Sequence, residues 1–305
     1  MITLAKLEGA YAPNTVSAYE RDVRKFASWC GARGYSALPA EPAAVLGFVE
    51  DCGRDCLART MRRHLIAVGM LHRLNGFSDP TAGEDVSLAL RRLARSRRTP
   101  PRQARGLSYA ELGRILSAMP STLVGQRDAA MLALGYEMLG RRAEIVALRD
   151  SDLEFRENGA LRVTIPRGKS DQTGLGRFAF TSRHTAELVF NWVAERGSGF
   201  PFLFCPIYRG WPIRRGLHSV TIVRVMRAAA ERAGLSECTE LSGHSLRVGA
   251  AQELLLRGFD TVAIARSGGG GQSRPCRATS RPLSTTFGSE AAPILWRGRI
   301  GSRAG

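Results

Sequence analysis

The sequence predicts a mainly α-helical protein of two domains, the second of which carries a small antiparallel β-sheet. Apolar residues recur at helical spacing through residues 10–95, where nothing has the alternation of a strand. That alternation occurs at residues 161–165, and residues 178–180 could pair with them. A basic segment with two prolines lies between these regions, and 305 residues are enough for two hydrophobic cores.

The first domain is expected to span residues 1–98 and to be entirely helical. One helix begins at Pro13, carries an apolar stripe at steps of three and four residues, and ends near Gly34. Three more helices are expected from about residues 42, 57 and 86. On the third of these four helices the arginines fall opposite the apolar positions, so we expect them to face solvent.

Residues 99–107 are expected to form a linker within a strongly basic stretch. Between Arg91 and Arg105 the chain has seven arginines and no acid, and Pro100-Pro101 prevents a helix from continuing. A solvated hinge and a segment lying along a DNA backbone are both consistent with this composition. The arginines expected to contact DNA are Arg59, Arg62, Arg63, Arg97, Arg98 and Arg102.

The second domain is expected to span residues 108–266. It opens with Ser108-Tyr-Ala-Glu111, a capping-box pattern that marks a helix start, and an apolar helix covers residues 127–138. The two predicted strands are joined by a turn that contains Lys169. Later helices are expected at about residues 184–196, at residues 218–233 and from His244 onward.

The composition changes at Ser267. The last 39 residues contain eight Gly, six Ser and three Pro, with no helical or strand period. We expect residues 267–305 to be either a disordered basic tail or the product of out-of-frame translation.

A formal net charge of +17 indicates a polyanionic partner, most simply nucleic acid. No apolar run is long enough to cross a bilayer, and the N-terminus lacks the pattern of a signal peptide. We therefore expect a cytoplasmic protein, associated with the nucleoid if bacterial, with no membrane partner. The six cysteines are scattered without a zinc-binding pattern, so we expect reduced thiols and no metal site.

His244 and Arg247 are three residues apart at the start of a predicted helix, so they would share one face. A guanidinium binds phosphate oxygens in a fork, and an imidazole donates a hydrogen bond or moves a proton near neutral pH. Alone, this pair is a weak signal and is more typical of an ordinary helix start with a satisfied polar pair. Lys169 adds a second signal, because only three of the 44 basic residues are lysines and a lysine can release a proton where an arginine cannot.

Arg141, Lys169, His244 and Arg247 occur in this order behind a helical domain and an arginine-rich linker. The chain thereby resembles the tyrosine recombinase (phage integrase) family, most closely its Cre-like members, over roughly residues 10–269. Arg141-Arg-Ala-Glu144 looks like the family's first arginine box, and its R-x-x-E spacing selects Arg141 rather than Arg142. Gly243-His-Ser-Leu-Arg247 looks like the second box. The resemblance implies an N-terminal helical core-binding (SAM-like) domain and the α-rich integrase catalytic fold.

The resemblance also implies a chemistry. A tyrosine attacks a DNA phosphodiester and forms a 3′-phosphotyrosyl link, and a free 5′-hydroxyl reverses the step without a cofactor or a metal. Arg141 and Arg247 would stabilise the charge on the phosphate, and Lys169 would protonate the departing 5′-oxygen. His244 would hydrogen-bond the phosphate or assist proton transfer, and Glu144 would orient the site.

The chain departs from the family pattern after Arg247. Gly270 stands where the family has His or Trp, Thr279 stands near the position of the nucleophilic tyrosine, and the last tyrosine in the chain is Tyr208. A threonine hydroxyl without an adjacent base does not replace a phenol. The segment that begins at Arg277 can be written in codons that encode Arg-Tyr-Leu-Glu two bases later, which is the pattern around the family's nucleophile. We therefore hypothesise an insertion or deletion in the gene near codons 268–271.

The resemblance implies a site-specific recombinase or integrase by descent that lacks its nucleophile and is inactive as written. The alternative is a non-enzymatic DNA-binding remnant or decoy. The expected partner is double-stranded DNA. The family assembles as a homo-oligomer on DNA, a tetramer, and we expect this assembly to be weakened because the exchanged C-terminal helix is missing. The target site, and a role in integration, resolution or transposition, stay open.

Overall fold

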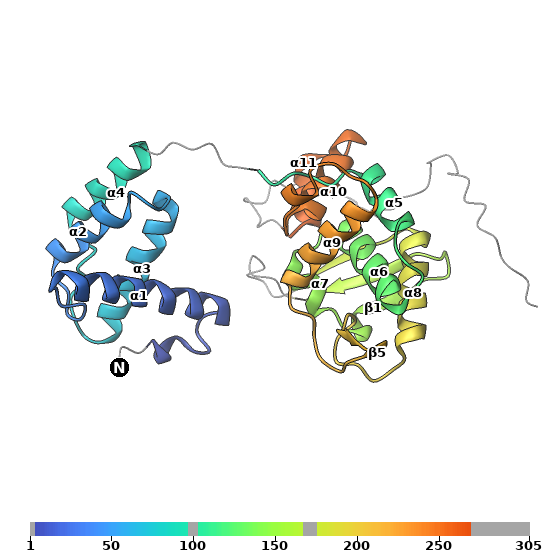
Figure 1. The fold of residues 1–305 in the computed structure, drawn as a ribbon, viewed down its shortest axis with the longest axis horizontal. Helices are drawn as coiled ribbons and strands as arrows, with labels where there is room; N and C mark the ends of the chain where they lie inside the picture. The colour runs from blue at the N-terminus through green and yellow to red at the C-terminus, as the bar shows by residue number, and fades with distance from the viewer. Residues whose placement is uncertain (1–3, 97–102, 167–175, 270–305) are drawn as a thin grey trace, which may run out of the picture. The chain divides into compact units, whose positions relative to one another are not determined.

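The structure is a computed structural model that describes residues 4–96, 103–166 and 176–269 (Figure 1). Contacts between residues divide the chain into two compact units, residues 1–102 and residues 103–305. Eleven α-helices and two small antiparallel sheets occur in the ranges that the structure describes. The predicted fold class, mainly helical with a small antiparallel sheet in the second unit, is confirmed.

Unit 1 is a helical bundle whose helix starts follow from local sequence. Proline occupies the first helical position of both α1 and α2, where its missing amide costs nothing, and Gly34 ends α1 in a left-handed conformation with φ 75°. The first helix therefore begins and ends where the sequence predicts. The helices are α1 (Pro13–Arg33), α2 (Pro42–Cys52), α3 (Ala58–Leu74) and α4 (Glu84–Ser96), preceded by a short 3-10 helix, η1 (Ala5–Leu7).

The core of unit 1 is aromatic where α1 meets α2. The rings of Phe26 and Phe48 are fully buried and meet edge to face, with their centres 5.2 Å apart. The centre of the Trp29 ring lies 5.7 Å from that of Phe48. Trp29 also donates a hydrogen bond to Asp51 at 3.2 Å, so its polar edge is satisfied. This packing holds α3 with its apolar face inward and its arginines at the surface.

Unit 2 surrounds one buried helix with six others and a sheet. Strand order in the larger sheet is β1-β2-β3, with both pairs antiparallel, and β4 pairs with β5 in a separate hairpin. The helices are α5 (Tyr109–Ser117), α6 (Leu123–Glu137), α7 (Arg142–Ala147), α8 (Arg183–Arg196), α9 (Val220–Arg232), α10 (Ser245–Leu256) and α11 (Thr261–Ser267). The strands are β1 (Leu153–Phe155), β2 (Leu161–Ile165), β3 (Arg177–Phe180), β4 (Ile207–Tyr208) and β5 (Trp211–Pro212). The short 3-10 helices are η2 (Asp150–Asp152) and η3 (Cys238–Glu240).

Two helix starts in unit 2 show how side-chain caps set the boundaries. Ser108 and Glu111 form the predicted capping box at the start of α5. Helix α6 begins earlier than predicted, at Leu123, because the Thr122 hydroxyl accepts the amide of Gly125 and so caps the helix.

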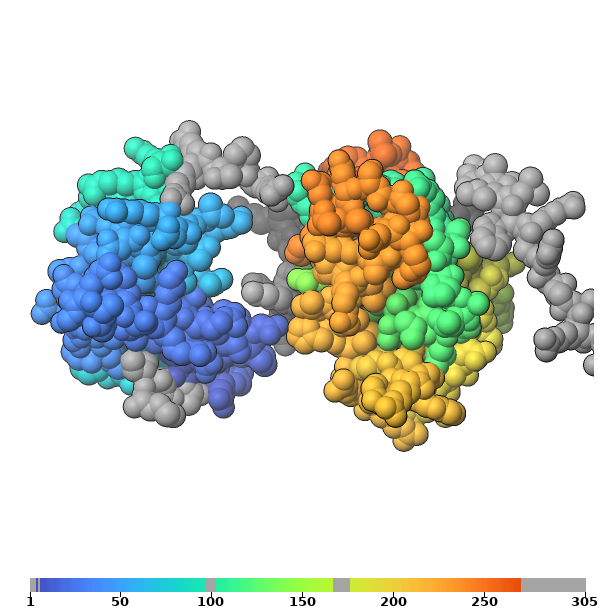
Figure 2. Space-filling model, viewed as in Figure 1, coloured from blue at the N-terminus to red at the C-terminus, as the bar shows by residue number. Residues whose placement is uncertain are grey.

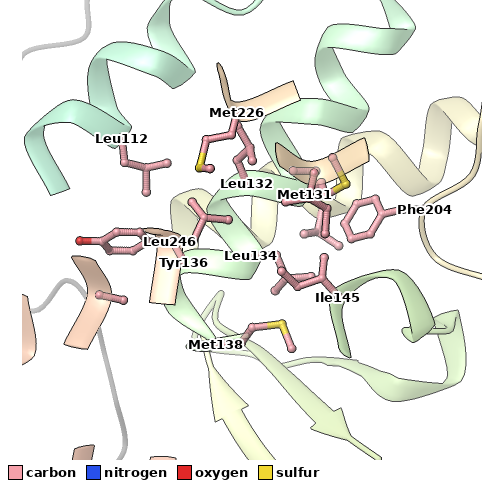
Figure 3. Packing of buried hydrophobic residues seen from close by; sticks show 14 of the residues in the cluster. Leu112, Met131, Leu132, Leu134, Tyr136, Met138, Ile145, Phe204, Met226 and Leu246 are labelled. Carbon is pink, nitrogen blue, oxygen red and sulfur yellow. The ribbon is translucent and has the colours of Figure 1, made fainter. Parts of the chain in front are cut away.

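Helix α6 is the centre of unit 2, and nearly all of its residues are buried. Figure 3 shows Leu132, Leu134 and Tyr136 of this helix among apolar side chains of the surrounding helices. Gly135 permits the close approach of α7, since a Cβ there would lie 2.6 Å from the end of the Ile145 side chain. Close packing on all sides fixes the C-terminal end of α6, from which the chain turns into the candidate site.

Among the residues that the structure describes, no helix is both long enough and apolar enough to cross a membrane.

Candidate active site

The site begins where α6 ends in a left-handed turn. Leu139 has φ 48°, which is uncommon for a residue with a branched side chain, and Gly140 follows it. Arg141 is the N-cap residue of α7, and its backbone amide donates to Oε2 of Glu144 at 3.0 Å. The R-x-x-E spacing therefore has a local cause, because a glutamate three residues into a helix reaches back to the capping residue.

The carboxylate of Glu144 contacts both Arg141 and Arg177. Arg141 donates through Nη1 to Oε1 at 2.5 Å, and Arg177 donates through Nη2 to Oε2 at 2.9 Å. Burial by itself would raise the pKa of Glu144, but the hydrogen bonds from Arg141 and the charges of Arg177 and Arg141 outweigh it and hold the pKa below its usual range. Glu144 is thus an anion that orients two arginines.

Arg177, at the start of β3, is a site residue that sequence reasoning did not single out. Besides Glu144, it donates through Nη1 to the carbonyl of Met138 at 2.8 Å and to the carbonyl of Ser267 at 2.6 Å. Its guanidinium therefore ties together the end of α6, helix α7 and the end of α11. The available sequence signal was its place next to the turn that contains Lys169.

Arg247 completes a cluster of three arginines. It lies in the first turn of α10 and donates through Nη1 to the carbonyl of Leu139 at 2.8 Å. Burial lowers the pKa of Arg247 from its ordinary value, the neighbouring charge of Arg141 lowers it further, Glu144 opposes this, and Arg177 adds a smaller lowering. Three cations around one carboxylate leave the cluster with surplus positive charge, which favours an incoming anion.

Two backbone carbonyls of the segment that ends α11 close over this cluster. Arg141 donates through Nη2 to the carbonyl of Gly269 at 2.9 Å, beside the contact of Arg177 with Ser267. A Cβ on Gly268 would lie 2.7 Å from Nη2 of Arg247, and Gly269 adopts φ 67°. Glycine is therefore required here for close approach at one position and for backbone conformation at the next.

His244 lies directly before α10, as its N-cap residue, and its side chain is exposed. The sequence placed His244 and Arg247 on one helix, whereas in the structure only Arg247 lies within the helix. Arg142 lies elsewhere: a Cβ on Gly243 would be 2.0 Å from Nε of Arg142, so this arginine packs on the loop before α10. Arg141, and not Arg142, reaches Glu144.

Several predicted site residues lie outside the described ranges. These are Lys169, Gly270, Thr279, Arg97, Arg98 and Arg102. Within the described ranges, no group of three or more His, Cys, Asp or Glu side chains is arranged to hold a metal ion.

The three predicted DNA-contacting arginines of α3 differ in their surroundings. All three are exposed. Arg63, however, donates through Nε and Nη2 to the two oxygens of Asp22, at 2.7 and 2.9 Å, and Asp22 is buried. Arg63 is therefore engaged within unit 1, a role that its position on the outer face of the helix did not indicate.

Comparisons with known proteins show the family to which the chain belongs. Residues 106–270 match the model of the phage integrase family, and residues 4–74 match the model of the phage integrase N-terminal SAM-like domain. The chain belongs to the phage integrase family. The predicted resemblance to tyrosine recombinases is thereby confirmed.

Two relatives are similar to this chain along most of their length. An integrase/recombinase XerD homolog of Selenomonas ruminantium is 28% identical over 272 residues, which cover 86% of this chain and 79% of the relative. The recombinase Cre of Escherichia phage P1 is 26% identical over 271 residues, covering 81% of this chain and 77% of Cre.

Solved structures show the same fold. The XerH site-specific recombinase, in a post-cleavage complex with a palindromic difH substrate, superimposes with a TM-score of 0.60 at 17% identity, and the match covers 84% of this chain and 73% of XerH. The Tn1549 transposon integrase bound to transposon right-end DNA gives a TM-score of 0.59 at 15% identity, covering 88% and 89% of the two chains.

Proposed function

We propose that this chain binds duplex DNA and places one phosphodiester at the cluster formed by Arg141, Arg177 and Arg247, but does not form the covalent link to DNA that its family makes. The observation that carries the proposal is the imbalance of charge at the cluster. Glu144 neutralises one arginine charge and two remain in a partly buried site. A phosphate is a suitable counter-ion, since guanidinium groups bind its oxygens in a fork.

The remaining roles follow the family chemistry. Arg141 and Arg247 stabilise the charge on the nonbridging oxygens. Lys169 corresponds to the general acid that would protonate the departing 5′-oxygen if cleavage took place, and His244, directly before α10 and exposed, hydrogen-bonds the phosphate. Glu144 orients Arg141. Arg59 and Arg62, exposed on α3, bind the DNA backbone.

The missing nucleophile separates this chain from an active recombinase. The six tyrosines of the chain are Tyr11, Tyr19, Tyr35, Tyr109, Tyr136 and Tyr208. None of them follows Arg247, where the family places its nucleophile. Tyr136 is fully buried in the core, and burial raises its pKa above the ordinary value of a phenol. The chain as written therefore occupies DNA without cutting it, which is the behaviour of a decoy or remnant.

A binding and cleavage assay tests the proposal. Duplex DNA selected by repeated binding from a random pool is converted to nicked suicide substrates and incubated with the full chain. We expect an affinity that falls steeply with salt concentration and no covalent protein–DNA adduct on an SDS gel. In Arg141→Ala and in Arg247→Ala, the slope of the logarithm of the binding constant against the logarithm of salt concentration is expected to decrease in magnitude by about one unit. Arg183→Ala, an exposed arginine at the start of α8, is the matched control and keeps the full slope.

Two outcomes would overturn the proposal in different ways. Failure to bind duplex DNA would exclude the DNA-binding function, and binding that depends neither on salt nor on the cluster arginines would exclude placement of a phosphate at the cluster. An adduct that disappears in Arg247→Ala would show that the chain is catalytic. The nucleotide sequence of the gene tests the cause separately: a tyrosine codon in another frame near codon 278 is expected, and its absence ends the frameshift hypothesis.

A further inference from the structure

A second surface of unit 2 has the chemistry of a ligand-binding site. Strands β4 and β5 form a hairpin in which Ile207 pairs with Pro212 and Tyr208 pairs with Trp211. The two turn residues, Arg209 and Gly210, have φ 50° and 83°, the signs required by a type I′ turn. The hairpin is therefore a defined structure rather than an irregular loop.

The base of the hairpin is fixed in the core. Phe204 and Cys205 are fully buried, and the carbonyl of Cys205 accepts a hydrogen bond from Nη1 of Arg127 at 3.2 Å. Next to the base, the two strands are joined by a hydrogen bond of 2.8 Å from the amide of Ile213 to the carbonyl of Pro206. A rigid base holds the tip in one orientation, so little conformational entropy is lost when the tip binds something.

The tip exposes two large aromatic side chains on one face. Tyr208 is 63% exposed and Trp211 is 75% exposed, whereas Trp29 and Trp192 are 8% and 0% exposed. Because Tyr208 and Trp211 are directly paired across the hairpin, their side chains lie on the same side of it. Two such rings presented together on a rigid support are typical of a binding surface.

The charge around the tip selects the kind of ligand. The guanidinium of Arg209 lies 5.3 Å from the centre of the Tyr208 ring, and Arg214 and Arg215 are exposed just beyond β5. From Gly197 to Leu217 the sequence contains these three arginines and no acid. An anionic ligand that also offers flat aromatic groups satisfies both features, and a nucleic acid strand has both.

We propose that this aromatic hairpin binds unpaired bases of a DNA strand, which stack on Trp211 and Tyr208 while Arg209 contacts the backbone phosphate. The faces of a base become accessible only when it leaves the helical stack, so the ligand is single-stranded or locally unpaired DNA. This inference rests on the proposed DNA-binding function but uses a different surface. In Figure 1 the hairpin lies at the end of unit 2 opposite α10 and α11, and Figure 2 shows that end uncovered.

Tryptophan fluorescence of the full chain tests the inference. The probes are a labelled single strand of twenty thymidines, a fully paired duplex, and the same duplex with three unpaired bases. We expect the single strand and the bulged duplex to quench the fluorescence of the protein, and the fully paired duplex to leave the Trp211 contribution unchanged. Trp211→Ala is expected to abolish this quenching and to weaken single-strand binding about tenfold, with a similar loss in Tyr208→Ala.

Two further variants separate stacking from a general effect on the fold. Trp211→Phe keeps a flat ring and is expected to restore most of the affinity for the single strand. Phe190→Ala removes an exposed aromatic ring of α8, 59% exposed, and is expected to bind as the unmodified chain does. Unchanged single-strand affinity in both Trp211→Ala and Tyr208→Ala would overturn the proposal.

A variant in the arginine cluster distinguishes base binding by the hairpin from phosphate binding by the cluster. Arg247→Ala is expected to weaken duplex binding and to leave quenching of Trp211 by the single strand intact, so the two proposals fail independently. A concentration-dependent self-association that disappears in Trp211→Ala, with no quenching by the single strand, would overturn base binding and identify the hairpin as a contact between copies of the chain.

Discussion

Arg177 donates a hydrogen bond of 2.9 Å to Oε2 of Glu144, the same oxygen that accepts the backbone amide of Arg141. The two residues are 33 positions apart in sequence. One carboxylate thus joins the start of α7 to the start of β3, and the arginine cluster depends on it.

We expect Glu144→Gln to destabilise unit 2 by about 2–3 kcal/mol, because it leaves partly buried arginine charges without their counter-ion. Urea denaturation followed by circular dichroism measures the effect. Glu154→Gln is the matched control: its carboxylate also pairs with two arginines, Arg156 and Arg162, but at the surface. The urea midpoint of this control is expected to stay unchanged. Equal midpoints for the two variants would contradict the role of Glu144.

Glu137 gives a prediction about pH. Burial raises the pKa of this carboxyl to about 7, although Ser182 donates to it through its backbone amide at 2.7 Å and its hydroxyl at 2.8 Å. Because the pKa is raised in the folded state, the stabilising contribution is present at acidic pH and is lost as the pH rises towards and through about 7. Glu137→Gln should remove this loss, so we expect it to be more stable than the unmodified chain at pH 8 by about 3 kcal/mol and equally stable near pH 4.

Denaturation with urea at several pH values between 4 and 8 tests this prediction. Glu187→Gln, an exposed position on α8, serves as the control and should follow the pH profile of the unmodified chain. A profile for Glu137→Gln that runs parallel to the unmodified one at all pH values would rule out a titrating Glu137.

Gly249 and Gly113 form a matched pair of helical glycines. A Cβ on Gly249 would lie 1.7 Å from the carbonyl oxygen of Leu107, where the segment before α5 packs on α10, while a Cβ on Gly113 would meet nothing within 4 Å. We expect Gly249→Ala to destabilise unit 2 by about 3 kcal/mol and Gly113→Ala to stabilise it by about 0.5–1 kcal/mol. Thermal and urea denaturation measure both variants. If α10 and the segment before α5 approach as closely as the structure shows, the change in stability is negative for Gly249→Ala and positive for Gly113→Ala.

Arg63 should behave differently from its neighbours on α3. Arg63→Ala removes two hydrogen bonds from the buried Asp22 and is expected to cost unit 1 about 1–2 kcal/mol. Arg59→Ala and Arg62→Ala should leave stability unchanged and each lower the salt dependence of duplex binding by about one unit. The contrary result, in which Arg63→Ala affects DNA binding and not stability, would show that Asp22 does not hold this side chain.

Local patterns explain which parts of the site could be predicted. Arg141 and Glu144 are three residues apart and their contact is a helix cap, so the R-x-x-E spacing of the family's first arginine box points to both. Gly269 contacts Arg141 from 128 residues away through its backbone carbonyl, and Ser267 contacts Arg177 in the same way. Every residue carries such a carbonyl and no sequence pattern marks one, so the sequence predicts the acid and two of the three cations but neither Arg177 nor these carbonyls.

The hairpin formed by β4 and β5 is a second feature that the sequence pattern does not predict. Tyr208 lies in a segment rich in Pro and Gly, a composition that is typical of an irregular loop. In the structure Tyr208 lies in a strand of a hairpin and is exposed, and Arg209 adopts the left-handed conformation that a glycine or asparagine would ordinarily supply at this turn position. An arginine at this position gives no sequence signal of the turn, so the sequence does not reveal the hairpin.

The carbonyls of Ser267 and Gly269 have a consequence for ligand recognition at the arginine cluster. These carbonyls already accept hydrogen bonds from the guanidinium groups of Arg177 and Arg141. A ligand that offers only hydrogen-bond acceptors therefore has no advantage over the carbonyls. When a phosphate displaces these carbonyls, the arginines contact a full negative charge in place of a carbonyl dipole. The cluster therefore discriminates by charge, and a DNA linkage made neutral as a methylphosphonate would leave both carbonyls in place.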